Sequence, residues 1–384
     1  MRYMPGDMET DCHSARGVYI YDTNRKEYID LISGVSVSYL GHNHPEIIQA
    51  IKNQAEKHLH LMVYGEFIQS PQVHFARLLC ENLPGNMENV YFVNSGAEAI
   101  EGAMKLAKKY TGRSEIIAFR NAYHGSTQGA LSLMGGENFK ANYRPLLPGI
   151  RFLNFNQQSD LNHITNKTAC VVIDPVQSEA GIILPKESYH IKLRDRCKET
   201  GALLVFDEIQ SGFGRLGNNF ACLHFGVAPD IIVLAKGLGR GLPLGAFISS
   251  REIMSALSNN PVLGHITTFG GHPLSCAAGM AAFRVLLQER LTESVTKKEN
   301  LFRKYLKHPA IVEIRGKGLM LAVEFDSASL MHKVIKKAIE NGIITDWFLF
   351  CETSVRISPA LTITEEEIKK ASEKLLLSID QALN

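Results

Sequence analysis

Short hydrophobic runs recur between about residues 90 and 250, and helical or polar stretches separate most of them. With the polar residues that end them, the runs read VYFVNSG, EIIAFRNAYHG, ACVVIDPVQSEAG, ALLVFDEIQSG, IIVLAKG and GAFISS. Strands that are hydrophobic throughout and alternate with helices are typical of a mostly parallel sheet with helices on both faces. This pattern predicts an α/β fold for the middle of the chain.

The beginning of the chain shows other periodicities. Residues 17–32 alternate between apolar and polar positions on either side of a turn at Asp22–Asn24, which predicts a hairpin. A helix is expected to begin at Pro45, because proline is favoured in the first turn of a helix. Its apolar face would contain Ile47, Ile48, Ile51 and Ala55.

After residue 290 the chain reads as a charged helix, then strand-like segments, then a final helix. Thr364 and Glu367 have the spacing of a capping box for that last helix. Because 384 residues are too many for one small core, we expect two domains. Residues 1–45 and 290–384 would form a small α+β domain, and residues 46–289 a large α/β domain.

Composition and charge exclude several functions. The net charge of +2 is too small for a protein that depends on nucleic acid or on an acidic membrane surface. No apolar run is long enough to span a bilayer, and the first residues have no apolar signal core. Seven scattered cysteines without a C-x-x-C pair indicate reduced thiols and a cytoplasmic protein. No cluster of typical ligands predicts a metal site.

Polar or glycine residues end each of the central hydrophobic runs. In an open α/β sheet, ligands bind outside the carboxyl ends of the strands. The residues at these positions are Asn94, Ser95, Tyr123, His124, Asp174, Gln177, Asp207, Gln210 and Lys236.

Ser95 and Gly96 stand where the first of these runs turns into a helix. Ser95 is at an N-cap position, and Glu98 three residues later would complete a capping box. The first turn of a helix presents free N–H groups that suit a phosphate. The same residues are equally consistent with a well-capped helix that binds no ligand.

Lys236 and Asp207 each end a hydrophobic run. A buried lysine has a lowered pKa and is a good imine-forming nucleophile, although it could instead extend its amine to solvent. A buried carboxylate needs a cationic partner. Pyridoxal phosphate has an aldehyde for Lys236, a pyridinium for Asp207 and a phosphate for Ser95 and Gly96. One ligand would therefore explain three otherwise weak signals.

A G-x-G-x-x-G pattern formed by Gly212, Gly214 and Gly217 offers a rival interpretation. Such a pattern after a strand is a fingerprint of dinucleotide binding, which would make the protein an NAD-dependent oxidoreductase. The turn should then begin directly at the strand end, but Asp207 and Glu208 intervene and would meet the pyrophosphate. We regard the spacing as a coincidence.

An ordered series of motifs resembles the class III, or ω-amino acid type, aminotransferases that depend on pyridoxal phosphate. The motifs include NSGAEAIEGAMKLA, NAYHGST, DPVQSEAG, VFDEIQSGFGRLG, AKGLGRGLPLGA, TTFGGHPLSCAAG and SVRISPALTIT, and they span the chain. The resemblance is strongest to the acetylornithine and ornithine aminotransferases. It implies the fold type I of these transferases, with a seven-stranded sheet in the large domain.

The resemblance also implies a role for each matched residue. Lys236 would form the internal aldimine and transfer the proton, and Asp207 would hold the pyridine nitrogen. The phosphate would lie against Ser95, Gly96 and Ala97, and the ring against Tyr123 with His124 beside it. Gln210 would approach the ring hydroxyl, and Asp174 and Gln177 complete the expected cofactor site. Thr268 would bind the phosphate of a second subunit, which implies a homodimer with active sites at the interface.

Glu179 and Arg356 match a pair that allows the family to accept two substrates in turn. The glutamate masks the arginine for a donor with a distal amine, and the freed arginine grips 2-oxoglutarate. A permanent salt bridge is the alternative. The pair favours transamination in a ping-pong cycle over racemisation, decarboxylation or an amino shift, which use the same lysine and aspartate.

Two positions depart from the ornithine-type pattern. Ser126 stands where these enzymes usually have an arginine for the substrate carboxylate, and Val35 where they often have a tyrosine. The donor is therefore expected to be held differently at its far carboxylate, or to lack one. Tyr64 is aligned with the substrate entrance.

Overall fold

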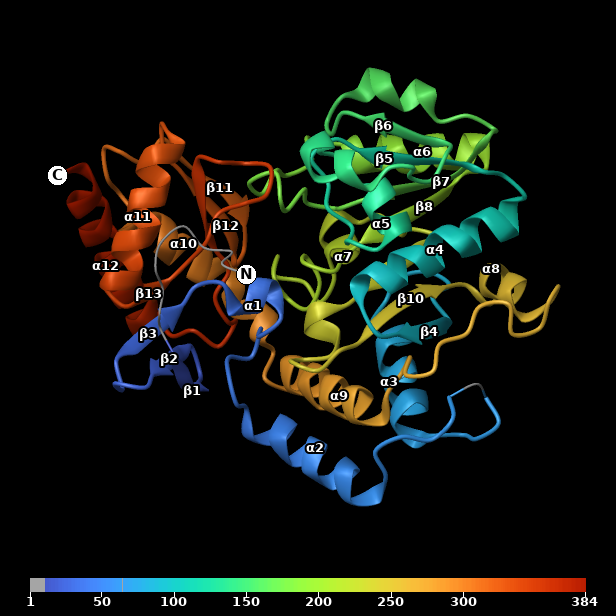
Figure 1. The fold of residues 1–384 in the computed structure, drawn as a ribbon, viewed down its shortest axis with the longest axis horizontal. Helices are drawn as coiled ribbons and strands as arrows, with labels where there is room; N and C mark the ends of the chain where they lie inside the picture. Colours follow the sequence, from blue (N-terminus) through green and yellow to red (C-terminus); the bar gives the residue numbers. More distant parts are fainter. Residues whose placement is uncertain (1–10, 64) are drawn as a thin grey trace.

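A computed structural model describes residues 11–63 and 65–384, and a seven-stranded sheet forms the centre of the larger part (Figure 1). The strand order is β4-β10-β9-β8-β7-β5-β6. The bounds are β4 Asn89–Val93, β5 Glu115–Phe119, β6 Ile150–Leu153, β7 Thr168–Ile173, β8 Leu203–Asp207, β9 Ile231–Leu234 and β10 Gly245–Ser249. All six predicted strands are present, and only β6 was not foreseen. Strand β10 runs antiparallel to both its neighbours, whereas the other pairs are parallel.

Helices cover both faces of this sheet because its strands are apolar on both sides. In β8, Leu203 and Val205 belong to one core cluster, and Leu204 and Phe206 to the other. The buried side of α4 packs in the cluster that contains Leu203 and Val205. Side chains of α3, α6 and α9 pack in the cluster that contains Leu204 and Phe206. The bounds are α3 Ser70–Cys80, α4 Gly96–Thr111, α6 Tyr189–Thr200 and α9 Pro273–Gln288. The predicted α/β architecture is confirmed.

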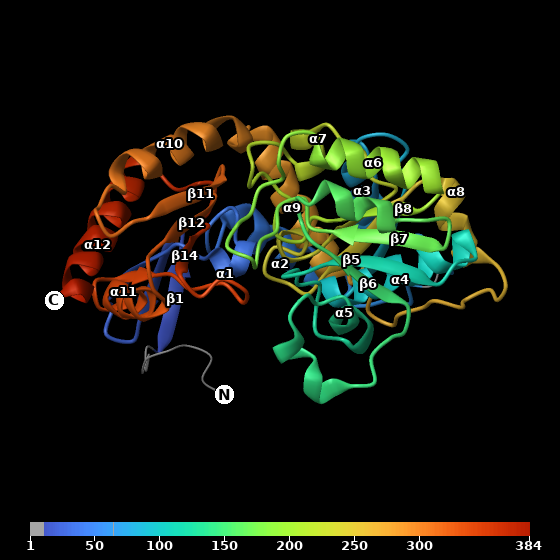
Figure 2. The ribbon, with the colours of Figure 1, turned by 90° about the horizontal axis from the view of Figure 1, so that it is seen from above.

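The two ends of the chain lie together in the smaller part, where blue and orange-red segments are neighbours (Figures 1 and 2). One sheet has the order β1-β2-β3-β13 and the other β11-β12-β14. The bounds are β1 Cys12–Arg16, β2 Tyr19–Asp22, β3 Glu27–Asp30, β11 Glu313–Lys317, β12 Met320–Glu324, β13 Ile343–Ile344 and β14 Ser354–Ile357. The predicted hairpin is the antiparallel β2–β3 pair. Pairing of β3 with β13 joins the N-terminal hairpin to the C-terminal segment.

The remaining helices surround these sheets or connect them. The longer ones are α2 Pro45–Lys57, α10 Val295–Tyr305, α11 Ala328–Glu340 and α12 Glu365–Leu383. The shorter ones are α1 Ser33–Ser36, α5 Gln128–Ser132, α7 Ala221–Phe225 and α8 Arg251–Met254. Short 3₁₀ turns are η1 Glu137–Phe139, η2 Ala141–Tyr143, η3 Gln158–His163, η4 Lys236–Leu238, η5 Ser255–Ser258 and η6 Leu291–Ser294. No helix of the described residues is long and apolar enough to cross a membrane.

The predicted starts of α2 and α12 were right, but the predicted inner face of α2 was right only for Ile47 and Ile51. Helix α2 begins at Pro45, and α12 has the Thr364–Glu367 capping box. The inner face of α2 contains Ile47 and Gln54, whereas Ile48 and Ala55 are exposed. A polar glutamine fits there because its side-chain amide donates to the carbonyl of His58 and so satisfies the end of the helix.

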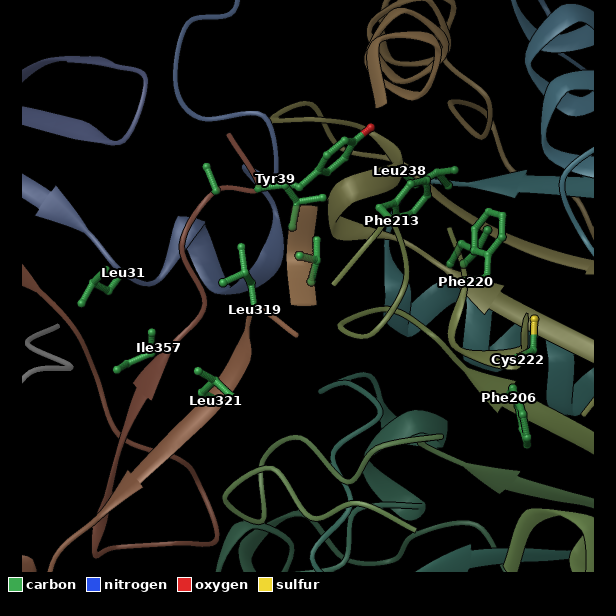
Figure 3. Close-up of a cluster of buried hydrophobic side chains, with 14 of the residues drawn as sticks. Leu31, Tyr39, Phe206, Phe213, Phe220, Cys222, Leu238, Leu319, Leu321 and Ile357 are labelled. Atoms are coloured by element: carbon green, nitrogen blue, oxygen red, sulfur yellow. The ribbon is translucent and has the colours of Figure 1, made fainter. Parts of the chain in front are cut away.

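One continuous hydrophobic core joins the two parts (Figure 3). Leu31 and Tyr39 come from the N-terminal segment, Phe213 from the centre, and Leu319 and Ile357 from the C-terminal strands. Tyr39 stacks on Phe213 with their ring centroids 5.6 Å apart. The sheet edge that carries the predicted site is therefore fixed relative to the C-terminal strands that carry Arg356.

Candidate active site

Most of the predicted cofactor residues surround one cavity of about 700 Å³ at the carboxyl ends of the central strands. The predicted residues that line it are Ser95, Gly96, Ala97, Tyr123, His124, Ser126, Asp174, Asp207, Gln210 and Lys236. They come from five loops that follow β4, β5, β7, β8 and β9. Parallel strands bring such loops to the same edge of a sheet, which is why residues far apart in sequence meet here.

Lys236 is half-buried at the start of η4, two residues after the end of β9. Burial lowers the pKa of its amine to about 8, although Glu179 and Asp207 oppose this shift. Its φ of 48° lies in the left-handed region, which is unfavourable for a residue with a side chain. Such strain is maintained only where the surrounding structure imposes it, and it is common at functional sites. The geometry thus presents an amine that is readily neutralised.

Asp207, the last residue of β8, is held by two hydrogen bonds. Its Oδ1 accepts from the backbone N–H of Ile209 at 3.0 Å, and its Oδ2 lies 2.7 Å from Nδ1 of His124. Burial lowers the pKa of His124, but the nearby Asp174 and Asp207 outweigh burial and leave that pKa raised. Burial also raises the pKa of Asp174 to about 8. The contact between His124 and Asp207 could not be read from the sequence.

His124, Asp174 and Asp207 also form the only candidate metal-ligand cluster among residues 11–63 and 65–384. Their ligand atoms all lie within 4.8 Å of one another. Nε2 of His124 is buried and has no hydrogen-bond partner within the described chain. Because the cluster borders the cavity, this unpartnered nitrogen indicates that a ligand belongs beside it.

The N-terminus of α4 opens toward the cavity. Ser95 is the N-cap, and its Oγ accepts from the N–H of Glu98 at 3.2 Å. The predicted capping box also requires the Glu98 carboxylate to accept from the N–H of Ser95. This part of the prediction was wrong, because the carboxylate accepts from the N–H of Asn94 instead. A side chain at position 96 would approach Cδ1 of Ile209 to 2.7 Å, so Gly96 keeps this turn close to the loop after β8. The first N–H groups of α4 can therefore face an anion.

The cavity wall includes Tyr123, whose hydroxyl lies 3.1 Å from the hydroxyl of Ser126. Val37 also lines the cavity, whereas Val35 is not among its lining residues. Residues 33–36 all have φ between 52° and 69°, which makes α1 a left-handed turn. This turn decides which valine faces the cavity, and the sequence pattern contained no signal for it.

Next to the cavity, Arg356 and Glu179 form a buried ion pair. Nη2 of Arg356 lies 3.1 Å from Oε1 of Glu179, and Gln210 hydrogen bonds to both residues. Burial raises the pKa of Glu179, but Arg356 and Lys236 outweigh burial and hold that pKa below its ordinary value. A second carboxylate, Asp346, binds Nε of Arg356 at 2.8 Å. The pairing of Glu179 with Arg356 agrees with the sequence, whereas the role of Asp346 was not foreseen.

Two further predicted residues, Gln177 and Thr268, are not among the residues that line this cavity. The side-chain amide of Gln177 donates to the carbonyl of Arg120 at 2.5 Å. Thr268 is exposed, and its carbonyl oxygen lies 2.9 Å from Nε2 of His60. Tyr64 lies outside the described residues.

The G-x-G-x-x-G pattern has a structural explanation. Gly214 and Gly217 have φ values of 91° and 94° and form turns that few other residues can adopt. In a dinucleotide-binding site, an acid that follows the glycines binds the ribose, and Asp230 stands at about that distance. Asp230 instead accepts two hydrogen bonds from Arg194. None of these residues lines the cavity.

Comparison with known proteins identifies the family. The family model for aminotransferase class-III matches residues 4–379. The chain belongs to this family.

Relatives and solved structures that resemble this chain are themselves aminotransferases or transaminases. The acetylornithine aminotransferase of Methanopyrus kandleri is 39% identical over 364 residues, which are 94% of this chain and 91% of that protein. The ornithine aminotransferase of Toxoplasma gondii superimposes with a TM-score of 0.91 at 31% identity, covering 99% of this chain and 91% of its own. An (S)-enantioselective ω-transaminase from Thermomicrobium roseum has a TM-score of 0.92 at 28% identity, covering 98% and 94%.

Enzymes of this family use pyridoxal 5'-phosphate, and the cavity fits that cofactor. The amine of Lys236 with its lowered pKa suits the aldehyde, the carboxylate of Asp207 suits the pyridinium nitrogen, and the N-terminus of α4 suits the phosphate. The unpartnered nitrogen of His124 is consistent with a polar ligand at this place.

Proposed function

We propose that this aminotransferase moves an amino group from an ω-amino, ornithine-like or acetylornithine-like donor to 2-oxoglutarate in a ping-pong cycle. The observation that carries the proposal is the buried Glu179–Arg356 pair beside Lys236. The acetylornithine and ornithine aminotransferases among its relatives support the donor class. The donor has to be accommodated by Ser126 and by neutral neighbours such as Val37, rather than by an arginine.

We propose the following roles for the residues of this chain. Pyridoxal phosphate, when bound, supplies a ring that withdraws electrons from the substrate carbon that carries the amine. The amine of Lys236 takes the proton from that carbon and returns it. Asp207 keeps a proton on the pyridine nitrogen, and His124 orients Asp207 through the 2.7 Å hydrogen bond. Tyr123 limits the access of water to the ring face.

Other residues at the cavity are proposed to hold the rest of the cofactor. Ser95, Gly96 and Ala97 at the start of α4 would hold the phosphate through their N–H groups and the Ser95 hydroxyl. Gln210 approaches the ring hydroxyl from the loop after β8, and Asp174 supports His124 from the loop after β7. Gln177 acts at a distance, because its amide holds the backbone of Arg120.

The Glu179–Arg356 pair would solve the problem of accepting two different substrates at one site. With the pair closed, Arg356 has no attraction for a carboxylate, so a distal amine can enter. When 2-oxoglutarate arrives, Glu179 moves aside, and Arg356 binds a carboxylate bidentately.

We also propose that the active unit is a homodimer that acts in the cytoplasm, where free thiols persist. An apolar surface surrounds a groove between residues 63–73 and 254–271, and it includes Ile68 at 92% exposure and Val262 at 70%. Thr268 is exposed and does not line the cavity of its own chain, and in the proposed dimer it would contact the phosphate in the site of a second copy. Residues 1–45 and 290–384 form the small domain in this proposal, and residues 46–289 the large one.

Single-turnover absorbance measurements on the holoenzyme test the proposed substrates. Acetylornithine, ornithine and a straight-chain ω-amino acid are each mixed with the enzyme, and 2-oxoglutarate is then added to convert it back. We expect one or more donors to change the spectrum of the cofactor, and 2-oxoglutarate to restore it with formation of glutamate. Donor consumption without glutamate would contradict the proposed acceptor.

The variant Arg356→Leu tests the acceptor site itself. Truncating one partner of a buried, hydrogen-bonded charge pair costs about 2–5 kcal/mol, so the reaction with 2-oxoglutarate should slow at least about 30-fold. An unchanged rate with 2-oxoglutarate would show that Arg356 is only part of a permanent salt bridge.

A further inference from the structure

Every nitrogen of the Arg356 guanidinium has a partner. Nε donates to Oδ1 of Asp346 at 2.8 Å, Nη1 to Gln210 at 3.2 Å, and Nη2 to both carboxylate oxygens of Glu179 at 3.1 and 3.2 Å. Its flat face lies 4.4 Å from the centre of the Phe348 ring. The plane and the rotation of the guanidinium are therefore both fixed.

The two carboxylates differ in how they are attached to the arginine. Asp346 belongs to the same stretch of paired backbone, since the N–H of Arg356 donates to the carbonyl of Asp346 at 2.9 Å. The hydroxyl of the preceding Thr345 donates to the carbonyl of Arg356 at 2.6 Å. Glu179 comes instead from the loop after β7 in the larger part of the molecule, and its Oε2 also accepts from the N–H of Leu349 at 3.2 Å. Its backbone carbonyl accepts from the N–H of Phe350 at 2.9 Å, so the backbone of Glu179 is held at the segment that carries Asp346. Asp346 would accompany Arg356 in any movement, whereas the side chain of Glu179 can turn away from it.

A guanidinium has two edges that can bind a carboxylate with two parallel hydrogen bonds. One edge presents Nε and Nη2, and the other presents Nη1 and Nη2. Because Asp346 occupies Nε, only the second edge can become free, and Gln210 and Glu179 occupy it here.

We propose that Asp346 is a positioning residue that holds the Arg356 guanidinium by Nε and thereby presents its Nη1–Nη2 edge to the carboxylate of the oxo-acid acceptor. This inference rests on the proposed function and extends it to a residue outside the Glu179–Arg356 pair. It implies that both Glu179 and Gln210 give up hydrogen bonds when the acceptor binds. Asp346 also keeps Arg356 paired with one carboxylate after Glu179 has left.

The test compares the two half-reactions of the holoenzyme in single turnovers followed by absorbance. Asp346→Ala should slow the half-reaction with 2-oxoglutarate between about 10- and 100-fold, since a misplaced binding group can cost that much in rate. The half-reaction with the amino donor should stay within about twofold, because Arg356 is not used there. Asp346→Asn keeps an oxygen for Nε and should recover most of the rate.

Two controls separate positioning from general damage to the fold. A straight-chain aldehyde is an acceptor without a carboxylate, so Asp346→Ala should leave its rate unchanged. Thr345→Val removes the neighbouring hydrogen bond to the backbone of Arg356 without touching the guanidinium. It should change the rates with 2-oxoglutarate and with the aldehyde equally, or change neither rate. Equal slowing of 2-oxoglutarate and the aldehyde in Asp346→Ala would overturn the inference.

The variant Arg356→Leu distinguishes the two levels of the proposal. If Arg356→Leu slows the reaction with 2-oxoglutarate and Asp346→Ala does not, the positioning role is wrong and the proposed function stands. If neither variant slows that reaction, Arg356 is not the acceptor site, and the proposed function fails first.

Discussion

At the scale of single residues, this protein concentrates unfavourable placements around one cavity. Lys236 is half-buried and has a left-handed backbone, and desolvation lowers its pKa to about 8. Asp174 is buried, and burial raises the pKa of its carboxyl group to about 8. Opposite shifts of an amine and a carboxyl group in one cavity are typical of sites that transfer protons near neutral pH. Stability alone would favour neither placement.

The lowered pKa of Lys236 can be measured in the cofactor-free protein. Only the neutral amine reacts with an acylating reagent, and a lowered pKa means that the neutral form appears at lower pH. The labelling rate of Lys236, followed by mass spectrometry of its peptide, should rise through about pH 8 and then level off. Free Nα-acetyl-lysine, with a pKa of about 10.4, should continue to rise over the same range. A Lys236 profile that matches the free amino acid would contradict the effect of burial.

At the scale of elements, close backbone packing determines where the lysine lies. Helix α9 passes so near to η4 that a Cβ atom on Gly279 would lie 2.1 Å from the carbonyl oxygen of Leu238. That oxygen belongs to the turn that begins with Lys236, and backbone atoms cannot move aside as a flexible side chain can. The glycine allows the helix and the catalytic turn to touch.

Gly279→Ala should therefore destabilise the protein and displace the lysine turn. Alanine favours a helix by about 1 kcal/mol over glycine, but overpacking costs about 1–3 kcal/mol and should prevail here. Denaturant unfolding should show a lower midpoint, and turnover should fall because η4 shifts. Arg284→Ala, an exposed position on the same helix, should change the free energy of unfolding by no more than about 0.5 kcal/mol. A more stable Gly279→Ala variant would show that propensity outweighs the close contact.

At the scale of the whole molecule, residues 59–63, 65–73 and 262–269 form an exposed apolar surface. Its large side chains include Leu59, Phe67, Ile68, Val262 and Phe269, each more than half exposed. The side chains of His60 and Phe269 contact each other with their ring centroids 5.1 Å apart, so the two segments form one surface. Contiguous apolar surface of this kind marks an interaction site.

Ile68→Asp and Val262→Asp test whether a second copy covers this surface. An unpaired charge buried in an interface costs several kcal/mol, so the dimer dissociation constant should rise at least about 100-fold. Light scattering should then show a monomer, with activity lost in proportion to the dimer, if Thr268 completes a neighbouring site as proposed. Ile191→Asp, at a position 53% exposed on α6, should leave mass and activity unchanged. A monomeric wild-type protein with full activity would exclude the dimer.

The sequence by itself determined the class of fold, six of the seven strands of the central sheet in their order along the chain, and the residues at the carboxyl ends of these strands. Hydrophobic runs and strand-end polar residues are local properties, so Lys236, Asp207 and Ser95 could be named without coordinates. Only the tertiary structure decided the contacts between distant segments. His124 meets Asp207, Asp346 holds Arg356, and a left-handed turn selects Val37 over Val35 for the cavity wall. These depend on how loops cross in space, because hydrogen bonds between residues far apart in sequence leave no periodic signal in either partner.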